Sequence, residues 1–161
     1  VRDLGVRHVL HALRDHDPAS VWLLGTDADS RVPPGWVRAH LRHANTGADA
    51  VTGLVGLLPG VDLTPERLRR YRSLVAAGVR PLDHDHVHGA NFGVRANAFL
   101  AVGGYRPLDT GEDRDLWFRL RDAGWAMRQP RDIPVFTSSR IAGRARGGLA
   151  DLLAGLLVED R

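Results

Sequence analysis

Short apolar runs alternate with segments of helical periodicity along the whole chain, and this alternation limits the fold more than any other feature. Residues 21–24 are wholly apolar and lie between polar turns, a pattern typical of a strand that is covered on both faces. Further strands are predicted within residues 48–58, 88–105 and 133–139. Strands that alternate with helices predict an α/β fold, in which helices flank a mainly parallel sheet.

The predicted helices carry apolar residues at spacings of three and four positions. Pro33 and Pro34 suit the first turn of one helix, because proline lacks the N–H group that this turn leaves unpaired. Val37, Leu41 and Ala44 are the expected buried face of that helix. Helices are expected within residues 6–14, 33–44, 64–77, 110–124 and 149–158.

Composition excludes several classes of protein. The 161 residues fit one domain, and none is cysteine, which excludes disulfides and thiolate metal sites. No uncharged apolar run approaches the roughly 18 to 20 residues that a membrane span needs, so the expected location is the cytoplasm, including the inner face of a membrane. The chain has 22 arginines and no lysine, a composition typical of GC-rich bacterial genes. Acidic residues are interspersed among the arginines. We therefore predict no nucleic-acid partner.

The apolar run of residues 21–24 is followed by the sequence TDADS, which holds two aspartates one residue apart. Ligands of α/β proteins bind beyond the carboxyl ends of strands, where Asp27 and Asp29 are expected to lie. Two carboxylates at this spacing could hold Mg²⁺ or Mn²⁺ and, through the cation, a diphosphate. The same aspartates could instead form Asx turns or cap the next helix.

Glu112 and Asp113 begin a predicted helix for which Gly124 is the expected C-cap. The helix macrodipole keeps carboxylates ionised at an N-terminus, so this pair could supply a general base. Thr110 and Asp113 also match the capping-box pattern. On the local sequence alone, the capping role is favoured.

Arg140 and Arg144 lie in a segment rich in arginine and glycine, residues 140–148. Guanidinium groups match the oxygens of a diphosphate, and the glycines would permit the segment to order around one. The alternative is a solvated loop in an arginine-rich chain.

Three histidines, His84, His86 and His88, alternate with other residues. On a strand their side chains would share one face, where three imidazoles could bind a transition metal. Histidines that line a sheet edge or a substrate groove would show the same pattern, and this alternative is favoured.

Taken together, three ordered segments resemble the family-2 glycosyltransferases, which have the GT-A fold and use nucleotide-diphosphate sugars. TDADS followed by VPPGWV resembles the Asp-x-Asp strand end and the helix after it in this family. HGANFGVRANAFLAVGGY resembles the family's segment with GAN, then arginine, then two glycines and an aromatic residue. GEDRDLWFRLRDAG is similar to its Glu-Asp helix. These segments span residues 26–124, most of the chain.

The resemblance implies a role for each candidate residue. Asp29 would bind a divalent cation, Mn²⁺ or Mg²⁺, and Asp27 would assist through the donor ribose or a metal-bound water. Asp113 would be the general base that deprotonates the acceptor hydroxyl, with support from Glu112. The other residues implied in donor binding are Gly89, Ala90 and Asn91 beneath the sugar, and Arg140 or Arg144 at the leaving diphosphate.

The resemblance also implies that the chain lacks a first segment. Family members open with a β-α-β segment that builds the nucleotide-base pocket, and the residues before position 14 resemble only the helix that follows it. We therefore expect an N-terminally truncated GT-A domain over residues 1–161, with an unpaired sheet edge that a homo-oligomer would cover.

The implied function is metal-dependent, inverting transfer of a sugar from a nucleotide-diphosphate donor to an acceptor hydroxyl. One alternative is a non-catalytic fragment or binding module with the same fold. A weaker alternative is a nucleotidyltransferase, which would be expected to show a basic, glycine-rich phosphate loop near its N-terminus, and this sequence shows none.

Overall fold

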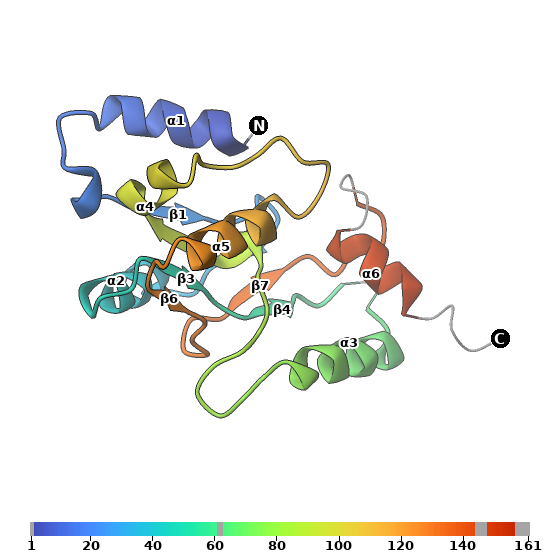
Figure 1. Ribbon diagram of the computed structural model, residues 1–161. Coiled ribbons are helices and arrows are strands. Elements are labelled where there is room, and N and C mark those ends of the chain that lie inside the picture. The colour runs from blue at the N-terminus through green and yellow to red at the C-terminus, as the bar shows by residue number, and fades with distance from the viewer. Residues whose placement is uncertain (1, 61–62, 144–147, 157–161) are drawn as a thin grey trace.

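The computed structural model describes residues 2–60, 63–143 and 148–156, and it shows helices around two small sheets (Figure 1). The predicted α/β class is therefore confirmed. No helix in the described part is both long enough and apolar enough to cross a membrane. The helices are α1 (Arg2–Ala12), α2 (Trp36–Asn45), α3 (Pro65–Ala77), α4 (Ala96–Ala101), α5 (Glu112–Asp122), α6 (Leu149–Gly155) and the 3-10 helices η1 (Pro18–Ser20) and η2 (Gly89–Asn91). The strands are β1 (Trp22–Gly25), β2 (Ser30–Arg31), β3 (Ala50–Thr52), β4 (Val55–Leu57), β5 (Phe92–Arg95), β6 (Met127–Arg128) and β7 (Val135–Thr137).

The strands form sheet A, in the order β1-β5-β3-β6, and sheet B, in the order β2-β7-β4. In the described residues, β3 pairs with β6 and β4 with β7 in parallel, whereas the other three pairs are antiparallel. The prediction of mixed pairing is therefore confirmed, but the prediction that parallel pairs predominate is wrong. The reason lies in β5, which begins where β1 and β3 end, because Phe92 pairs with both Gly25 and Thr52. Because β5 starts at the end of the sheet where β1 and β3 finish, it runs between them in the opposite direction.

The segment predicted as one strand, residues 48–58, forms β3 in sheet A and β4 in sheet B. Gly53 lies at the break. A Cβ atom at this position would collide with the Nδ2 atom of Asn91 and would lie 2.5 Å from the carbonyl oxygen of Ile133. Only glycine permits so close an approach, and it allows the chain to pass from one sheet to the other.

Side chains pack on both faces of sheet A. Successive side chains of a strand point to opposite faces, so each strand contributes to both sides. Along β3, Ala50 packs into a core with Phe92 and Leu116, while Val51 packs on the other face with Ala39 of α2. Helix α1 lies outermost over α4 (Figure 1). Its partly buried apolar residues, Val6 and Leu10, pack against the first core.

The predicted buried face of α2 is mostly wrong. Val37 and Leu41 are 52% and 40% exposed. The helix also begins later than predicted, at Trp36, so Pro33 and Pro34 lie in the turn before it. The buried residues of α2 are Trp36, Ala39, His40 and Ala44. On this face the rings of Trp36 and His40 both form hydrogen bonds with the buried Asn91, an arrangement that leaves Val37 and Leu41 on the outer side.

Candidate functional site

One pocket of about 660 Å³ gathers most of the residues predicted to form a site. We call it the main pocket. It lies beyond the ends of β1 and β7, beside η2 and the first turns of α5 and α6. The predicted residues that line it are Asp27, Asp29, Gly89, Ala90, Asp113 and Arg140. Asp27 and Arg140 are 113 positions apart in the sequence, so it is the fold that brings these residues together.

Each of the two aspartates forms an ion pair with an arginine. The Asp27 carboxylate lies 2.8 Å from Arg2 Nη2, and the Asp29 carboxylate lies 2.9 Å from Arg140 Nη2. Thr137 Oγ1 also donates to Asp29 Oδ1 over 3.4 Å. Neither aspartate caps α2, whose N-cap is Gly35 with no side-chain hydrogen bond. The helix-cap alternative is therefore wrong, and both carboxylates face the main pocket.

Negative charge is concentrated around Asp27. Burial raises the pKa of Asp27, and repulsion from Asp29 and Asp113 raises it further, while Arg2 opposes both effects. A cation relieves such repulsion, and carboxylate oxygens are the ligands that Mg²⁺ and Mn²⁺ prefer. Asp29 and Asp27 are therefore the residues that could hold a divalent cation, in exchange for their arginine partners. In the described ranges, however, no three acidic or histidine side chains are already gathered to hold a metal ion.

Asp113 lies in the first turn of α5 and is half-buried against the main pocket. The N-cap of α5 is Gly111, in the left-handed region at φ 75°, and no side chain caps the helix. The capping-box interpretation of Thr110 and Asp113 is therefore wrong. The Asp113 carboxylate thus makes no capping bond and lies in the first turn of α5, at the main pocket.

Arg2 is a pocket residue that the sequence analysis did not single out. In addition to its ion pair with Asp27, its Nε atom lies 3.5 Å from Glu112 Oε1, and its guanidinium lies 5.7 Å from the centre of the Tyr105 ring. Gly89 accommodates it, because a Cβ atom there would collide with Arg2 Nη1. Glu112 reaches the site only through Arg2 and is not among the lining residues. No local motif marks Arg2, since its partners are distant in sequence.

Asn91 belongs to the core and does not line the main pocket. Its Oδ1 atom accepts hydrogen bonds from Trp36 Nε1 at 3.0 Å and from His40 Nε2 at 3.1 Å. Its Nδ2 atom donates to the carbonyl oxygens of Leu54 and Ile133. Of the predicted segment at Gly89, Ala90 and Asn91, the structure thus brings only the first two residues to the pocket.

Arg140 is about half exposed at the mouth of the main pocket, where its guanidinium can reach a ligand once it leaves Asp29. Arg144 lies outside the described residues.

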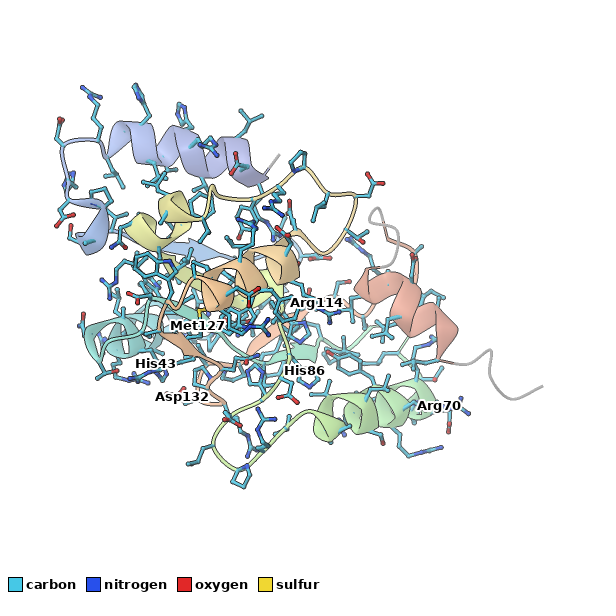
Figure 2. All side chains as sticks on the ribbon, in the orientation of Figure 1. His43, Arg70, His86, Arg114, Met127 and Asp132 are labelled. Carbon is cyan, nitrogen blue, oxygen red and sulfur yellow. The ribbon has the colours of Figure 1, made fainter. Side chains whose placement is uncertain are left out.

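The rings of the three histidines stack, with 5.8 Å between the centroids of His84 and His86 and 5.6 Å between those of His86 and His88. Figure 2 shows His86 on the segment that leads away from α3, and its Nε2 atom lies 2.8 Å from the carbonyl oxygen of Val75. The rings are arranged face to face. In the described ranges they do not form a group of side chains placed to hold a metal ion. Of the three, His88 lines the main pocket, and His84 and His86 do not. Burial, with help from His86 and His84, lowers the pKa of His88 to about 4.

Comparison of the chain with models of protein families and with curated proteins finds no match. The functional proposal therefore depends on the chemistry of the main pocket.

Proposed function

We propose that this chain carries the catalytic site of a metal-dependent, inverting glycosyltransferase with a GT-A fold, which uses a nucleotide-diphosphate sugar. The observation that carries the proposal is the main pocket itself. It unites the aspartate pair, the Gly89–Ala90 turn and the Asp113 carboxylate. These are the three segments on which the resemblance to family-2 glycosyltransferases rests, and proximity in space supports a common role.

The pocket offers carboxylates that could hold a cation and a guanidinium group that could bind a diphosphate. Asp29 and Asp27 would hold a divalent cation, which when bound would offset the charge of the leaving diphosphate. Arg140 would bind the diphosphate directly, because a guanidinium matches phosphate oxygens. In the described structure Arg140 neutralises Asp29 instead. Donor and cation together would therefore give each of these two side chains a new partner of opposite charge.

Asp113 would act as the general base. In the transfer step its carboxylate takes the proton of the acceptor hydroxyl, and the acceptor oxygen bonds to the anomeric carbon of the donor sugar. The bond from that carbon to the diphosphate oxygen breaks, and its electron pair leaves with the nucleoside diphosphate. Attack on the face opposite the leaving group inverts the configuration of the carbon. A carboxylate that lines the pocket and makes no capping bond is placed to accept this proton.

The role of Asp29 is tested by donor binding. A thermal-shift screen of UDP-, GDP- and dTDP-sugars with Mn²⁺ first identifies a donor, because a ligand raises the melting temperature by an amount set by its concentration relative to its Kd. We expect Asp29→Asn to abolish Mn²⁺-dependent binding of that donor in titration calorimetry, with an unchanged circular dichroism spectrum. The matched control is Asp109→Asn, an exposed aspartate outside the pocket. Unchanged binding by the Asp29 variant would contradict the metal assignment.

The role of Asp113 is tested by turnover. We expect Asp113→Asn to bind the donor almost as the wild type does, and to lose at least about 100-fold in turnover, the usual contribution of a general base. Release of nucleoside diphosphate over a panel of acceptors measures it, with Asp109→Asn again as the control. Turnover that survives in Asp113→Asn would refute the base assignment. A wild type that binds the donor but never releases nucleoside diphosphate would instead favour the binding-module alternative.

A further inference from the structure

A second pocket, of about 560 Å³, lies next to the main pocket. We call it the serine pocket, after Ser138 and Ser139 in its wall. Asp29 and Arg140 line both pockets, so the 2.9 Å ion pair between them forms part of the wall that separates the two. Ala28 and Ser138 also line both pockets, and the roles described above use Asp29 and Arg140 but no other residue of the serine pocket.

The serine pocket lies at the carboxyl edge of sheet B. Strands β4 and β7 are parallel and end side by side at Leu57 and Thr137, and the chain segments that follow each strand line the pocket. The Leu58 amide donates to the Thr137 carbonyl oxygen over 2.7 Å and holds these segments together. Arg31 of β2 lines a further side. Ligands of α/β proteins bind at such strand ends, so the position favours a binding site.

The lining of the serine pocket is positively charged. It contains two guanidinium groups, those of Arg31 and Arg140, and Asp29 is its one acidic residue among those the structure describes. Arg140 already neutralises Asp29. Arg31 is exposed and has no ion pair or hydrogen bond from its side chain to any residue in the described ranges. One positive charge at the pocket is therefore left without an internal partner.

Hydroxyl groups supply the remaining donors. Ser138 and Ser139 both line the pocket, and Ser139 is held close to Gly60. A Cβ atom at Gly60 would lie 2.5 Å from Ser139 Oγ, so glycine keeps space around this hydroxyl. Guanidinium and hydroxyl groups together are the donors that proteins use for phosphate and carboxylate oxygens.

We propose that the serine pocket binds an oxyanion group, a phosphate or a carboxylate, of a small molecule. Arg31 is its main ligand, and the hydroxyls of Ser138 and Ser139 are supporting donors. The site shares Asp29 and Arg140 with the main pocket, but its proposed ligands, Arg31 and the two serines, have no role in glycosyl transfer, and Asp27 and Asp113 lie outside it. If both proposals hold, a substrate could carry a second anionic group beyond the donor diphosphate.

The test is a titration of the full chain followed by two-dimensional ¹H–¹⁵N NMR, with glucose 6-phosphate, glucuronate and neutral glucose as probes. We expect at least one anionic sugar to cause saturable shifts of the Gly60 and Ser139 amides, and glucose to cause none. Arg31→Gln should weaken that binding at least fivefold. Arg121→Gln, an exposed arginine of α5 outside both pockets, is the matched control and should bind as the wild type does.

The two anionic probes separate the sources of the oxyanion, because a response to one alone identifies phosphate or carboxylate as the group bound. The proposal is overturned if neither anion shifts the Gly60 and Ser139 amides, or if Arg31→Gln and Arg121→Gln weaken binding equally. Shifts confined to Gly89 and Ala90 would also overturn it, since these residues report on the main pocket. That last result would leave the proposed glycosyltransferase function intact. The spectrum of each variant shows in the same experiment whether it is folded.

Discussion

Asn91 joins three parts of the molecule through one side chain. It is fully buried, accepts from two rings of α2, and donates to carbonyl oxygens that precede β4 and β7. Because Trp36 Nε1 can only donate, the Oδ1 atom of Asn91 must face α2. His40 must then carry its proton on Nε2. A residue predicted to contact the donor thus has a structural task that positions its neighbours Gly89 and Ala90.

We expect Asn91→Ala to lower the free energy of unfolding by about 3 to 5 kcal/mol, because each buried polar group left unpaired costs about 1 to 3 kcal/mol. Urea denaturation measures the change. Asn45→Ala, an exposed asparagine at the end of α2, is the control and should change the free energy by no more than about 0.5 kcal/mol. Equal effects in the two variants would contradict the role assigned to Asn91.

At the residue scale, the sequence predicted which carboxylates meet at one pocket better than it predicted their partners. Asp27, Asp29 and Asp113 could be chosen because a strand end and a helix start are visible in the local pattern. Arg2 and the structural role of Asn91 could not, since both depend on contacts between segments at least 25 residues apart. Local periodicity carries no information on such contacts.

At the scale of single elements, the two ends of α5 show how glycine sets helix boundaries. The helix starts after Gly111 and stops before Gly124, which has φ 80°. Gly124 N donates to the Arg121 carbonyl oxygen and Trp125 N donates to that of Leu120, which is the Schellman arrangement. The predicted stop at Gly124 is confirmed, because a glycine after a periodic segment is a local signal.

Replacing glycine by alanine should have opposite effects after the end of α5 and inside α1. Gly124→Ala should destabilise the protein by about 1 kcal/mol, because an alanine is strained in the left-handed region. Gly5→Ala should stabilise it by about 0.5 to 1 kcal/mol, because Gly5 is inside α1 and a Cβ atom there meets nothing within 4 Å. Thermal or urea denaturation compares the two. A loss of stability in both variants would contradict this account of α1.

At the scale of the whole molecule, alternation of strands and helices was sufficient to predict the α/β class but not the division into two sheets. The division occurs at Gly53, where a Cβ atom would collide with Asn91. Only glycine lets the chain pass from one sheet to the other at this point. The antiparallel course of β5 likewise depends on where the long segment after α3 returns to the sheet. Both are properties of pairs of distant segments, which periodicity within one segment does not report.

The whole molecule should lose stability in mild acid. Burial lowers the pKa of both His40 and His88 to about 4, below the value of 6.5 expected in an unfolded chain. Between these values the unfolded state binds more protons, so the free energy of unfolding falls as the pH drops from 6.5 toward 4 and is fully recovered above 6.5. Each histidine contributes at most about 1.4 kcal/mol per pH unit.

Urea denaturation at pH 5 and pH 7 measures this difference. His88→Gln should reduce it by the share of one histidine, whereas His16→Gln, an exposed histidine, should leave it as in the wild type. Equal stability of the wild type at the two pH values would refute the prediction.

The loop with Asp27 and Asp29 has a mechanical consequence, because it joins β1 of sheet A to β2 of sheet B. Each sheet has its own ladder of hydrogen bonds, and this loop is one of the connections between them. A ligand that is held by both aspartates and by Arg140, which follows β7, would link the two sheets and resist any motion of one relative to the other. Occupation of the main pocket would then stiffen the protein as a whole and not only the loop that the ligand contacts.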